Sequence, residues 1–495
     1  MNFAKVMLIV PNPRTMSLVS PIVSLFYSIF KKNGIDMKFF DTTFYDMSER
    51  YTDPNIVKET ILGVKPVGKR SVTELLDGNR VEKDFKDNVK EYNPDVIMAS
   101  VMESAVHFTR DLLKYTDDLN VKQIMGGVFP TFAPEVAINF DEIDAICVGE
   151  GENVIVPLVK KIKQGESIAK MPNMWVKENG EIIKGELLPP TDINKNPPFD
   201  VVPYDDSRFY RPMSGKIYRM FPVETHRGCI YDCAFCNSPL QKKKFGIAYF
   251  RHKTIENVMI DIKYFVKCKA EYLFFWDDNF FLYSMEDFEK FCSYYEKIRI
   301  PFYVQSHPKN LDEEKIKMLK EVGMHRVGIG IEHGNEDFRR RIIRRYYTNE
   351  EAIKGCELLR KYEVSFSCNN IVGFPFETPK LREDTVELNR LLKSDTASCS
   401  IFTPFHGTPL REIAVQNGWL DPNVIAPTNN DWSVLNMPQF TPAQIAGKAR
   451  TFNLYVRLPK NRWDEIRLAE NVNTTDGDLM FNRLREEVKE IMKDD

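Results

Sequence analysis

Three cysteines stand close together in the stretch THRGCIYDCAFCNSP, residues 225–239. Cys229, Cys233 and Cys236 are separated by three and then two residues. Thiolates are soft ligands that select zinc, copper(I) or iron–sulfur clusters. A structural zinc site uses four ligands, but the chain has no second Cys-x-x-Cys, and His226 is an unusual fourth ligand. The triplet predicts an iron–sulfur cluster with one iron left open; a structural zinc knot and incidental buried cysteines remain alternatives.

The elements that must position this loop are predicted from residue 216 onward, where apolar runs alternate with helix-length segments. Six strands with intervening helices are too few for an eight-stranded barrel and predict a partial one, whose chemistry belongs at the carboxyl ends of the strands. The cysteine loop follows the first strand. The predicted strands are 221–226, 272–278, 302–307, 326–334, 365–373 and 398–405, and the predicted helices are 255–268, 285–298, 313–323, 349–362 and 382–394.

The N-terminal part also alternates strand and helix, which predicts βαβ units and a parallel, doubly wound, Rossmann-like sheet. Ligands bind beyond the carboxyl ends of such strands, here in the loops PNPR, SVMES, GGVFPTF and GEGE. The predicted strands are 5–10, 36–41, 95–100, 122–127 and 145–152, with helices at 18–34 and 105–119.

A hairpin at Asn179-Gly180 and a stiff, proline-dense stretch separate the two α/β parts. The end of the chain is predicted to be mainly helical and carries no reactive cluster. The predicted domains are the doubly wound domain at 1–170, the hairpin and Pro-rich linker at 171–215, the partial barrel at 216–415 and a helical C-terminal domain at 416–495.

Charge and hydropathy exclude several classes of protein. Lys plus Arg is 68 and Asp plus Glu is 71, which gives no general case for a nucleic-acid partner or a polybasic membrane anchor. The N-terminal run VMLIV is too short for a signal peptide, and no segment approaches the roughly 20 apolar residues of a membrane span. We therefore expect a cytoplasmic protein. The cysteines outside the triplet lie singly and are expected to be buried or idle thiols.

With aromatic Phe235 before the last cysteine, the Cys-x3-Cys-x2-Cys spacing resembles the signature of the radical S-adenosylmethionine (SAM) superfamily. The resemblance implies that Cys229, Cys233 and Cys236 hold a 4Fe–4S cluster whose open iron chelates SAM, with Phe235 against the cofactor. In this family an electron from the cluster cleaves SAM to a 5′-deoxyadenosyl radical, which abstracts hydrogen from an unactivated carbon.

The stretch WDDNFF, at the end of the second barrel strand, resembles the family's contact with the ammonium group of SAM. The resemblance implies Asp277, Asp278 and Asn279 as SAM-binding residues, and carboxylates suit an ammonium partner. An acidic loop or helix cap is the alternative.

Two later strand ends are similar to other SAM contacts of the family. GIGIEHG implies Glu332 as the acceptor from the ribose hydroxyls, and NNIVGFPFET implies Ile371, Gly373 and Pro375 around adenine. IFTPFHGTPL resembles the end of the sixth strand in the same subgroup.

Two further features of the barrel remain open. His307, at the end of the third strand, is a candidate catalytic proton donor, a substrate contact or an ordinary wall residue. The arginine run FRRRIIRRYY, 338–347, suits either an anionic substrate or, more commonly, the solvated face of a helix.

A doubly wound domain before a radical SAM core resembles the cobalamin-binding domain of one large subgroup, and the resemblance covers most of residues 5–415. GGVFPTFAPE and DAICVGEGE resemble segments of that domain, although the Asp-x-His-x-x-Gly motif that supplies a cobalt ligand is absent. A domain that no longer binds cobalamin is the alternative. The residues implied for cobalamin are Asn12, Ser100, Val101, Gly126, Gly127, Val128, Thr131, Gly149 and Glu150.

Together these features predict a cobalamin-dependent radical SAM methyltransferase that methylates an unactivated carbon. A radical SAM cyclase, oxidase or carbon–carbon coupling enzyme, with or without cobalamin, is the second hypothesis, and a zinc-binding structural protein is the third. The implied partners are a small-molecule, lipid or peptide substrate and an electron donor such as flavodoxin or ferredoxin.

Overall fold

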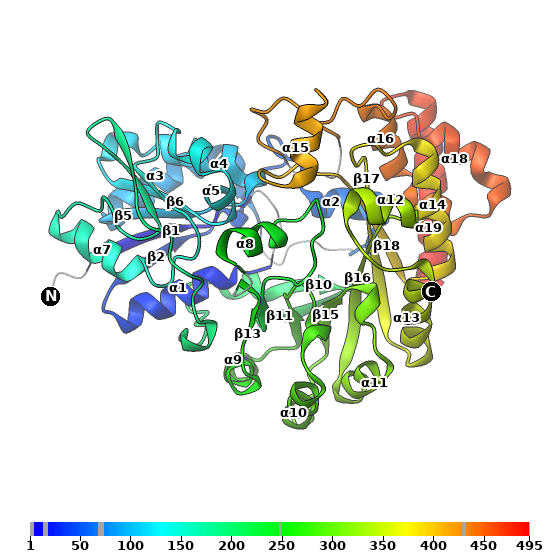
Figure 1. Ribbon diagram of the computed structural model, residues 1–495, viewed down its shortest axis with the longest axis horizontal. Helices are drawn as coiled ribbons and strands as arrows, with labels where there is room; N and C mark the ends of the chain where they lie inside the picture. Colours follow the sequence, from blue (N-terminus) through cyan, green and yellow to red (C-terminus); the bar gives the residue numbers. More distant parts are fainter. Residues whose placement is uncertain (1–3, 13–17, 68–73, 247–248, 428–431, 495) are drawn as a thin grey trace. The chain divides into compact units, whose positions relative to one another are not determined.

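The computed structural model describes residues 4–12, 18–67, 74–246, 249–427 and 432–494. Its contacts divide the chain into two compact units, which are described separately (Figure 1). Unit 1 comprises Met1–Asp53, Lys69–Arg211 and Leu240–Tyr264, and unit 2 comprises Pro54–Gly68, Pro212–Pro239 and Phe265–Asp495.

Unit 1 contains the predicted doubly wound sheet, with the strand order β2-β1-β5-β6-β7-β8-β9. The first five strands in this order are parallel. The order reverses between β1 and β5, which is where open α/β sheets bind their ligands. The strands are β1 (Lys5–Ile9), β2 (Asp36–Phe40), β5 (Val96–Ser100), β6 (Lys122–Gly126), β7 (Ala145–Cys147), β8 (Met174–Glu178) and β9 (Glu181–Lys184).

Helices cover both faces of this sheet. Each crossover between parallel strands is right-handed, so the connecting helices lie on one face where the strand order runs one way and on the other face where it runs the opposite way. Figure 1 shows α1 on one face, and α3 and α4 on the other. The antiparallel hairpin β8–β9 turns at Asn179 and Gly180, whose φ values of 53° and 80° suit the predicted two-residue turn. The helices are α1 (Pro21–Lys32), α3 (Val81–Tyr92), α4 (Val106–Lys114), α5 (Val128–Phe132), α6 (Pro134–Ile138) and α7 (Ile155–Gln164).

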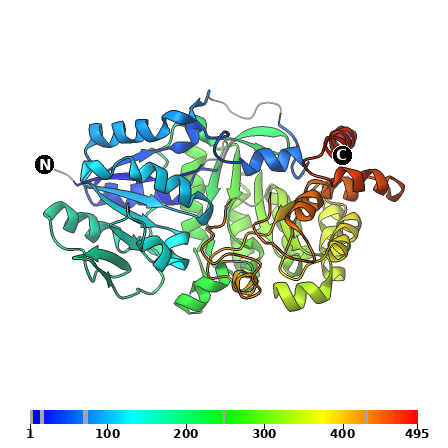
Figure 2. The same ribbon diagram turned by 90° about the horizontal axis from the view of Figure 1, so that it is seen from above.

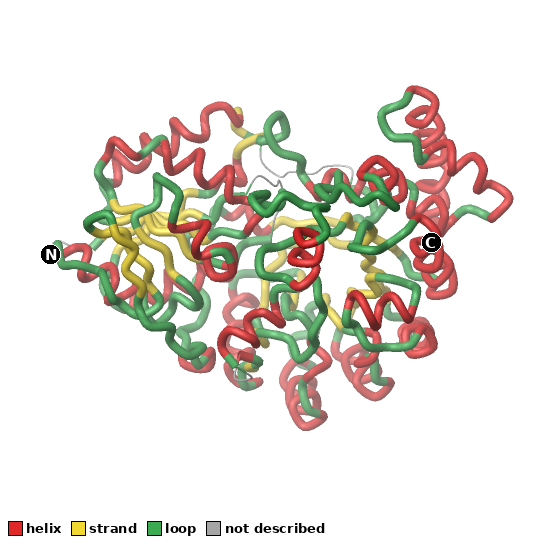
Figure 3. Tube along the Cα trace, turned by 45° about the horizontal axis from the view of Figure 1, so that its top comes forward, coloured by secondary structure: helices red, strands yellow, loops and turns green. Residues whose placement is uncertain are grey.

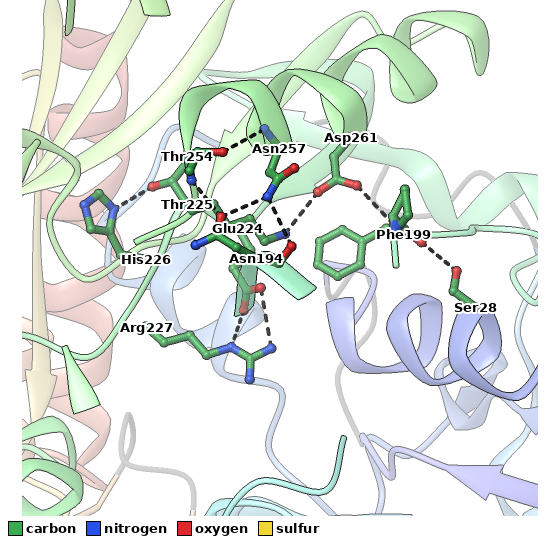
Figure 4. Close-up of polar contacts among 12 residues, drawn as sticks. Ser28, Asn194, Phe199, Glu224, Thr225, His226, Arg227, Thr254, Asn257 and Asp261 are labelled. Atoms are coloured by element: carbon green, nitrogen blue, oxygen red, sulfur yellow. Dashed lines mark hydrogen bonds and ion pairs between the residues drawn. The ribbon is translucent and has the colours of Figure 1, made fainter. Parts of the chain in front are cut away.

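The proline-dense linker is fixed to unit 1 by polar contacts. Phe199 N donates to Asp261 Oδ1 at 3.1 Å, and Asn257 Nδ2 donates to Asn194 Oδ1 at 2.9 Å. Ser28 Oγ donates to the carbonyl of Pro198 at 2.6 Å. These contacts tie residues 194–199 to α1 and to α9 (Ile255–Lys267) (Figure 4).

Unit 2 contains the predicted partial barrel. Six strands pair in parallel in the order β11-β14-β15-β16-β17-β18, and β10 (Tyr210–Met213) extends the β11 edge. Figure 3 shows the strands as one curved sheet with helices outside it. The strands are β11 (Lys216–Val223), β14 (Tyr272–Phe275), β15 (Phe302–Ser306), β16 (Met324–Glu332), β17 (Ser365–Val372) and β18 (Thr396–Ile401); the connecting helices are α10 (Met285–Tyr295), α11 (Glu313–Val322), α13 (Asn349–Lys361) and α14 (Pro379–Leu392).

The predicted C-terminal helices share a hydrophobic core with β17, β18 and α14. The segment with α2 (Pro54–Thr60) lies beside the same helices (Figure 2). Arg485 Nε donates to Thr60 O at 2.7 Å, and Asn453 Nδ2 donates to Ile61 O at 3.1 Å. Among the described residues, no helix has the length and apolar character needed to cross a membrane. The C-terminal helices are α15 (Pro409–Gln416), α16 (Pro442–Arg450), α17 (Phe452–Arg457), α18 (Trp463–Ala469) and α19 (Thr475–Asp494).

Candidate functional site

The cysteine loop lies directly after β11 and is held by backbone bonds to two later segments. Ala234 N donates to Ile343 O at 2.8 Å, and Leu410 N donates to Ala234 O at 3.1 Å. Cys233 is 6% exposed, while Cys229 and Cys236 are half-buried. The loop is therefore anchored at its centre, between two of its cysteines.

The chemistry of the three thiols suits a cluster. Burial, with a smaller contribution from the nearby Asp278 carboxylate, raises the pKa of Cys229 and of Cys236 to about 12. Such thiols become thiolates only when a cation compensates their charge, as iron does. The described residues contain no group of three His, Cys, Asp or Glu side chains placed around a single metal ion. In a 4Fe–4S cluster each thiolate binds a different iron atom, so the three sulfur atoms need not surround a single metal ion.

The carboxyl group of Asp277, one of the predicted SAM-binding residues, is hydrogen-bonded to the residues at the start of the cysteine loop. Its Oδ1 accepts from Thr225 N at 2.7 Å and from His226 N at 2.8 Å, and its Oδ2 pairs with Thr225 Oγ1 at 2.5 Å. Thr225 Oγ1 also lies 2.6 Å from His226 Nδ1 (Figure 4). Burial raises the pKa of Asp277 to about 7, opposed by these hydrogen bonds. The carboxyl group thus fixes the two residues that lead into the loop.

Asp278 is placed differently from its neighbour. Its side chain is exposed, and Oδ2 accepts from Ser238 Oγ at 2.6 Å, beside the cysteine loop. Among the described residues we find no partner for Oδ1. Asp278 therefore presents a carboxylate oxygen near Cys229 and Cys236, and its charge contributes to the raised pKa of both thiols.

The buried residues Asn279 and His307 belong to one polar group with the half-buried Tyr231 of the cysteine loop. Asn279 Nδ2 donates to Asn310 Oδ1 at 2.8 Å, which also accepts from Tyr231 Oη at 2.5 Å. The ring of His307 stacks on that of Tyr231, with centroids 4.0 Å apart. Tyr231 and Asn310 are site residues that the sequence analysis missed, because no recognised pattern marks them.

Glu332 ends β16 in a strained conformation. Its φ is +66°, and His333 N donates to Ile331 O at 2.8 Å, which closes a tight turn around it. A register shift interrupts the β16–β17 ladder at the same point. A non-glycine residue in this region costs free energy and commonly marks a functional position. Burial raises the pKa of Glu332, and nearby Arg345 lowers it.

The residues predicted around adenine lie at the end of β17, and most of their contacts in this structure are with other residues of the protein. Gly373 N donates to the fully buried Glu377 at 2.6 Å, and a Cβ on Gly373 would lie 2.9 Å from a methyl carbon of Ile445. Ile371 is half-buried against the core, and Pro375 is buried. Phe235 packs on Phe374, with ring centroids 5.7 Å apart.

Several of the buried polar atoms that lack a partner in the described structure belong to residues that follow the carboxyl ends of the barrel strands. Native proteins satisfy such atoms, so their recurrence at the ends of several strands is consistent with a bound polar ligand. Those that follow the carboxyl ends of β11, β14, β15 and β18 are Asn237 Oδ1, Asn279 Oδ1, His307 Nε2 and Thr403 Oγ1. The described residues therefore fit a polar cofactor such as SAM.

His307 makes one prediction testable without any cofactor. Lys309 N donates to His307 Nδ1 at 3.2 Å, so the neutral ring carries its proton on Nε2. Burial, aided by Arg345, lowers the pKa of His307 from 6.5 to about 2. The folded state then binds fewer protons than the unfolded state, and stability falls as pH drops below the unfolded pKa. We expect a loss of about 1.4 kcal/mol through this group between about pH 7.5 and about pH 5.5.

Urea unfolding at both pH values, for wild type and for His307→Phe, measures this contribution. The phenyl ring keeps the stacking on Tyr231, so the variant should lose less stability on acidification than wild type. Equal losses in the two proteins would contradict the prediction.

In unit 1, the predicted cobalamin residues line the carboxyl edge of the doubly wound sheet. Thr131 Oγ1 donates to Gly127 O at 2.7 Å and accepts from Gly149 N at 3.0 Å. Gly127 has a φ of +102°, and a Cβ there would lie 2.6 Å from Val101 N, so only glycine fits. Along this edge Val101 N also donates to Gly126 O at 2.8 Å.

The same edge exposes apolar side chains and is partly covered by α8 (Ser238–Phe245). Met102 and Val128, after β5 and β6, are 50% and 38% exposed, which suits contact with the flat face of a large ring. Lys244 Nζ donates to Thr131 O at 2.8 Å, and Phe245 lies against Gly149. This edge therefore fits a ligand such as cobalamin.

Two other predicted cobalamin residues, Glu150 and Asn12, make contacts within the fold, and a third, Ser100, lies beside Gly127. Glu150 pairs with Arg251 at 2.6 Å and accepts from Thr191 N at 2.7 Å. Asn12 N donates to Thr42 Oγ1 at 2.9 Å. The hydroxyl oxygen of Ser100 would lie 3.3 Å from a Cβ on Gly127.

Comparison with known families identifies both units. Residues 223–388 match the Radical SAM superfamily, and residues 67–159 match the B12 binding domain. The chain thus combines a radical SAM domain, as its cysteine loop predicted, with a B12-binding domain. These domains imply a 4Fe–4S cluster, SAM and cobalamin as cofactors, and the two predicted domain types are confirmed.

Individual relatives match much of the chain. The chain is 28% identical over 393 residues to an uncharacterized methyltransferase of Pyrococcus horikoshii, covering 75% of this chain and 81% of the relative. It is 23% identical over 337 residues to an anaerobic magnesium-protoporphyrin IX monomethyl ester cyclase of Rubrivivax gelatinosus, covering 66% and 59%.

Solved structures show the same fold at low sequence identity. The methyltransferase TsrM of Kitasatospora setae matches with a TM-score of 0.64 and 15% identity, over 92% of this chain and 84% of that one. The cobalamin-dependent SAM radical enzyme OxsB matches with a TM-score of 0.68 and 14% identity, over 99% and 72%.

Proposed function

We propose that this enzyme is a cobalamin-dependent radical SAM methyltransferase that methylates an unactivated carbon of a small-molecule, lipid or peptide substrate. The observation that carries the proposal is the pairing, in one chain, of a three-cysteine loop beside unpartnered polar atoms with a B12-binding domain. Similarity to the uncharacterized methyltransferase of Pyrococcus horikoshii supports the reaction type.

Different residues of the chain would bind the cluster and the separate parts of SAM. Cys229, Cys233 and Cys236 would ligate the cluster, and Asp278, with Asn279 beside it, would pair with the ammonium group of SAM. Glu332 would accept from the ribose hydroxyls, and the segment Ile371–Pro375 would border adenine. When bound, the cluster supplies an electron for cleaving SAM, and cobalamin supplies a methyl carrier.

Cobalamin would bind at the carboxyl edge of unit 1. The backbone of Val101, Gly126 and Gly127 shapes the edge, Thr131 braces it, and Val128 offers apolar contact. A flavodoxin or ferredoxin is the proposed electron donor.

One half of the proposed reaction can be tested without knowing the substrate. The enzyme, reconstituted anaerobically with iron, sulfide and cobalamin, would be incubated with SAM carrying a deuterated methyl group and a chemical reductant. We expect nearly equimolar cobalt and the appearance of deuteromethyl-cobalamin, measured by mass spectrometry. Cluster binding without cobalt or without this product would favour the second candidate, a cyclase, which the Rubrivivax relative suggests.

A further inference from the structure

The arginine run at 338–347 is not the solvated helix face that its composition favours. Arg340, Arg341 and Arg344 are exposed, but Arg339 and Arg345 are buried. The backbone explains the difference, because residues Arg339–Ile343 form a π-helical turn and Arg344 has a φ of +55°. Such turns and left-handed residues interrupt ordinary helix periodicity and collect at functional sites.

Arg345 points at the cysteine loop. Its Nη1 donates to the Sγ of Cys233 at 3.4 Å, and its Nη2 donates to Gly330 O at 2.6 Å. A Cβ on Gly330 would lie 2.9 Å from that Nη2 and 2.3 Å from Glu332 Oε1, so glycine makes room for both charged groups. The guanidinium is thus held in one orientation toward the sulfur.

The loop and the arginine segment are also joined through the backbone. Ala234, next to Cys233, donates its N–H to Ile343 O at 2.8 Å, two residues before Arg345. Arg345 is 8% exposed, so water screens its charge weakly. The exposed arginines of the same run, Arg340, Arg341 and Arg344, are not shielded from water in this way.

We propose that Arg345 is a positioning residue that raises the reduction potential of the cluster held by Cys233. This inference rests on the proposed role of Cys233 as a ligand. Reduction adds one negative charge to the cluster, and an N–H donor to a ligand sulfur together with a fixed positive charge stabilises that form. The carboxylate of Glu332 offsets part of the charge, while the N–H···S contact remains.

Replacing Arg345 with glutamine or lysine tests the proposal on the reconstituted full chain. The readout is the midpoint of an anaerobic redox titration followed by electron paramagnetic resonance, without SAM or substrate. At the wild-type midpoint we expect about tenfold less reduced relative to oxidised cluster in Arg345→Gln, equivalent to about 59 mV for one electron. Arg345→Lys keeps the charge but not the planar fork, and its midpoint should lie between the two.

Arg341→Gln is the matched control, because it removes the same charge from an exposed arginine of the same run that pairs with Asp337. Its midpoint should equal that of wild type. If Arg345→Gln fails to fold, the Lys variant decides: a lower midpoint supports the proposal, and an unchanged one overturns it.

A full cluster with an unchanged midpoint in Arg345→Gln overturns the inference, even if that variant binds SAM weakly, because Arg345 would then serve SAM. Failure of the wild-type protein to bind a 4Fe–4S cluster would instead overturn the proposed function, so the two outcomes remain distinct.

Discussion

Replacing Cys233 with alanine should abolish the cleavage of SAM. Cys233 is the most buried cysteine of the triplet and lies beside the backbone anchor at Ala234. Without it, only two of the three thiols remain in the loop, so the 4Fe–4S cluster should not assemble. We expect 5′-deoxyadenosine formation to fall by at least ~100-fold, since changes even to groups around metal ligands typically cost 10–100-fold.

The measurement combines the iron content after anaerobic reconstitution with chromatography of the products formed from SAM. Cys268→Ala is the matched control, because Cys268 is half-buried and lies outside the loop, after α9. It should keep the full iron content and activity. SAM cleavage at the wild-type rate in Cys233→Ala would rule out the proposed cluster site.

Much of the fold was predictable, because parallel strands buried on both faces give continuous apolar runs. The strands around Val6–Ile9 and Val96–Ala99 are such runs, and each was found within a residue or two of its predicted limits. The assignment of residues 54–68 to unit 2 and 240–264 to unit 1 was not predictable, because it depends on distant contacts such as that of Arg485 with Thr60.

The position of Arg345 could not be read from composition. A run of arginines on a regular helix would place most of them in solvent, but the π-helical turn and the left-handed Arg344 rotate Arg345 inward. Neither feature has a recognised sequence signal here. Glu377 and His333 are similar cases: their side chains, 3.3 Å apart and fully buried, were not singled out as site residues.

The distinction between Asp277 and Asp278 was available from the sequence. Side chains alternate between the two faces of a strand. Phe275 is buried and Trp276 is exposed, and the alternation continues past the end of β14, with Asp277 buried and Asp278 exposed. The parity of the strand therefore separates a buried carboxyl group that supports the loop from an exposed one that is free to face the proposed ligand.

This distinction predicts opposite results for two adjacent substitutions. Asp277→Ala removes the acceptor of two buried backbone N–H groups, those of Thr225 and His226. Each unsatisfied group costs about 1–3 kcal/mol. Because these residues lead into the cysteine loop, the variant should unfold at lower urea concentration and bind less iron.

Asp278→Ala should leave the fold and the iron content unchanged, because the side chain is exposed and accepts one bond, from Ser238. It removes the proposed partner of the SAM ammonium group. Hydrogen bonds to charged groups contribute about 1.5–3 kcal/mol, so the Kd for SAM should rise by roughly 10- to 150-fold. Anaerobic titration calorimetry with the reconstituted protein measures this change. A variant Asp277→Ala with a full cluster and weakened SAM binding, beside an Asp278→Ala that binds SAM like wild type, would transfer the ammonium contact to Asp277.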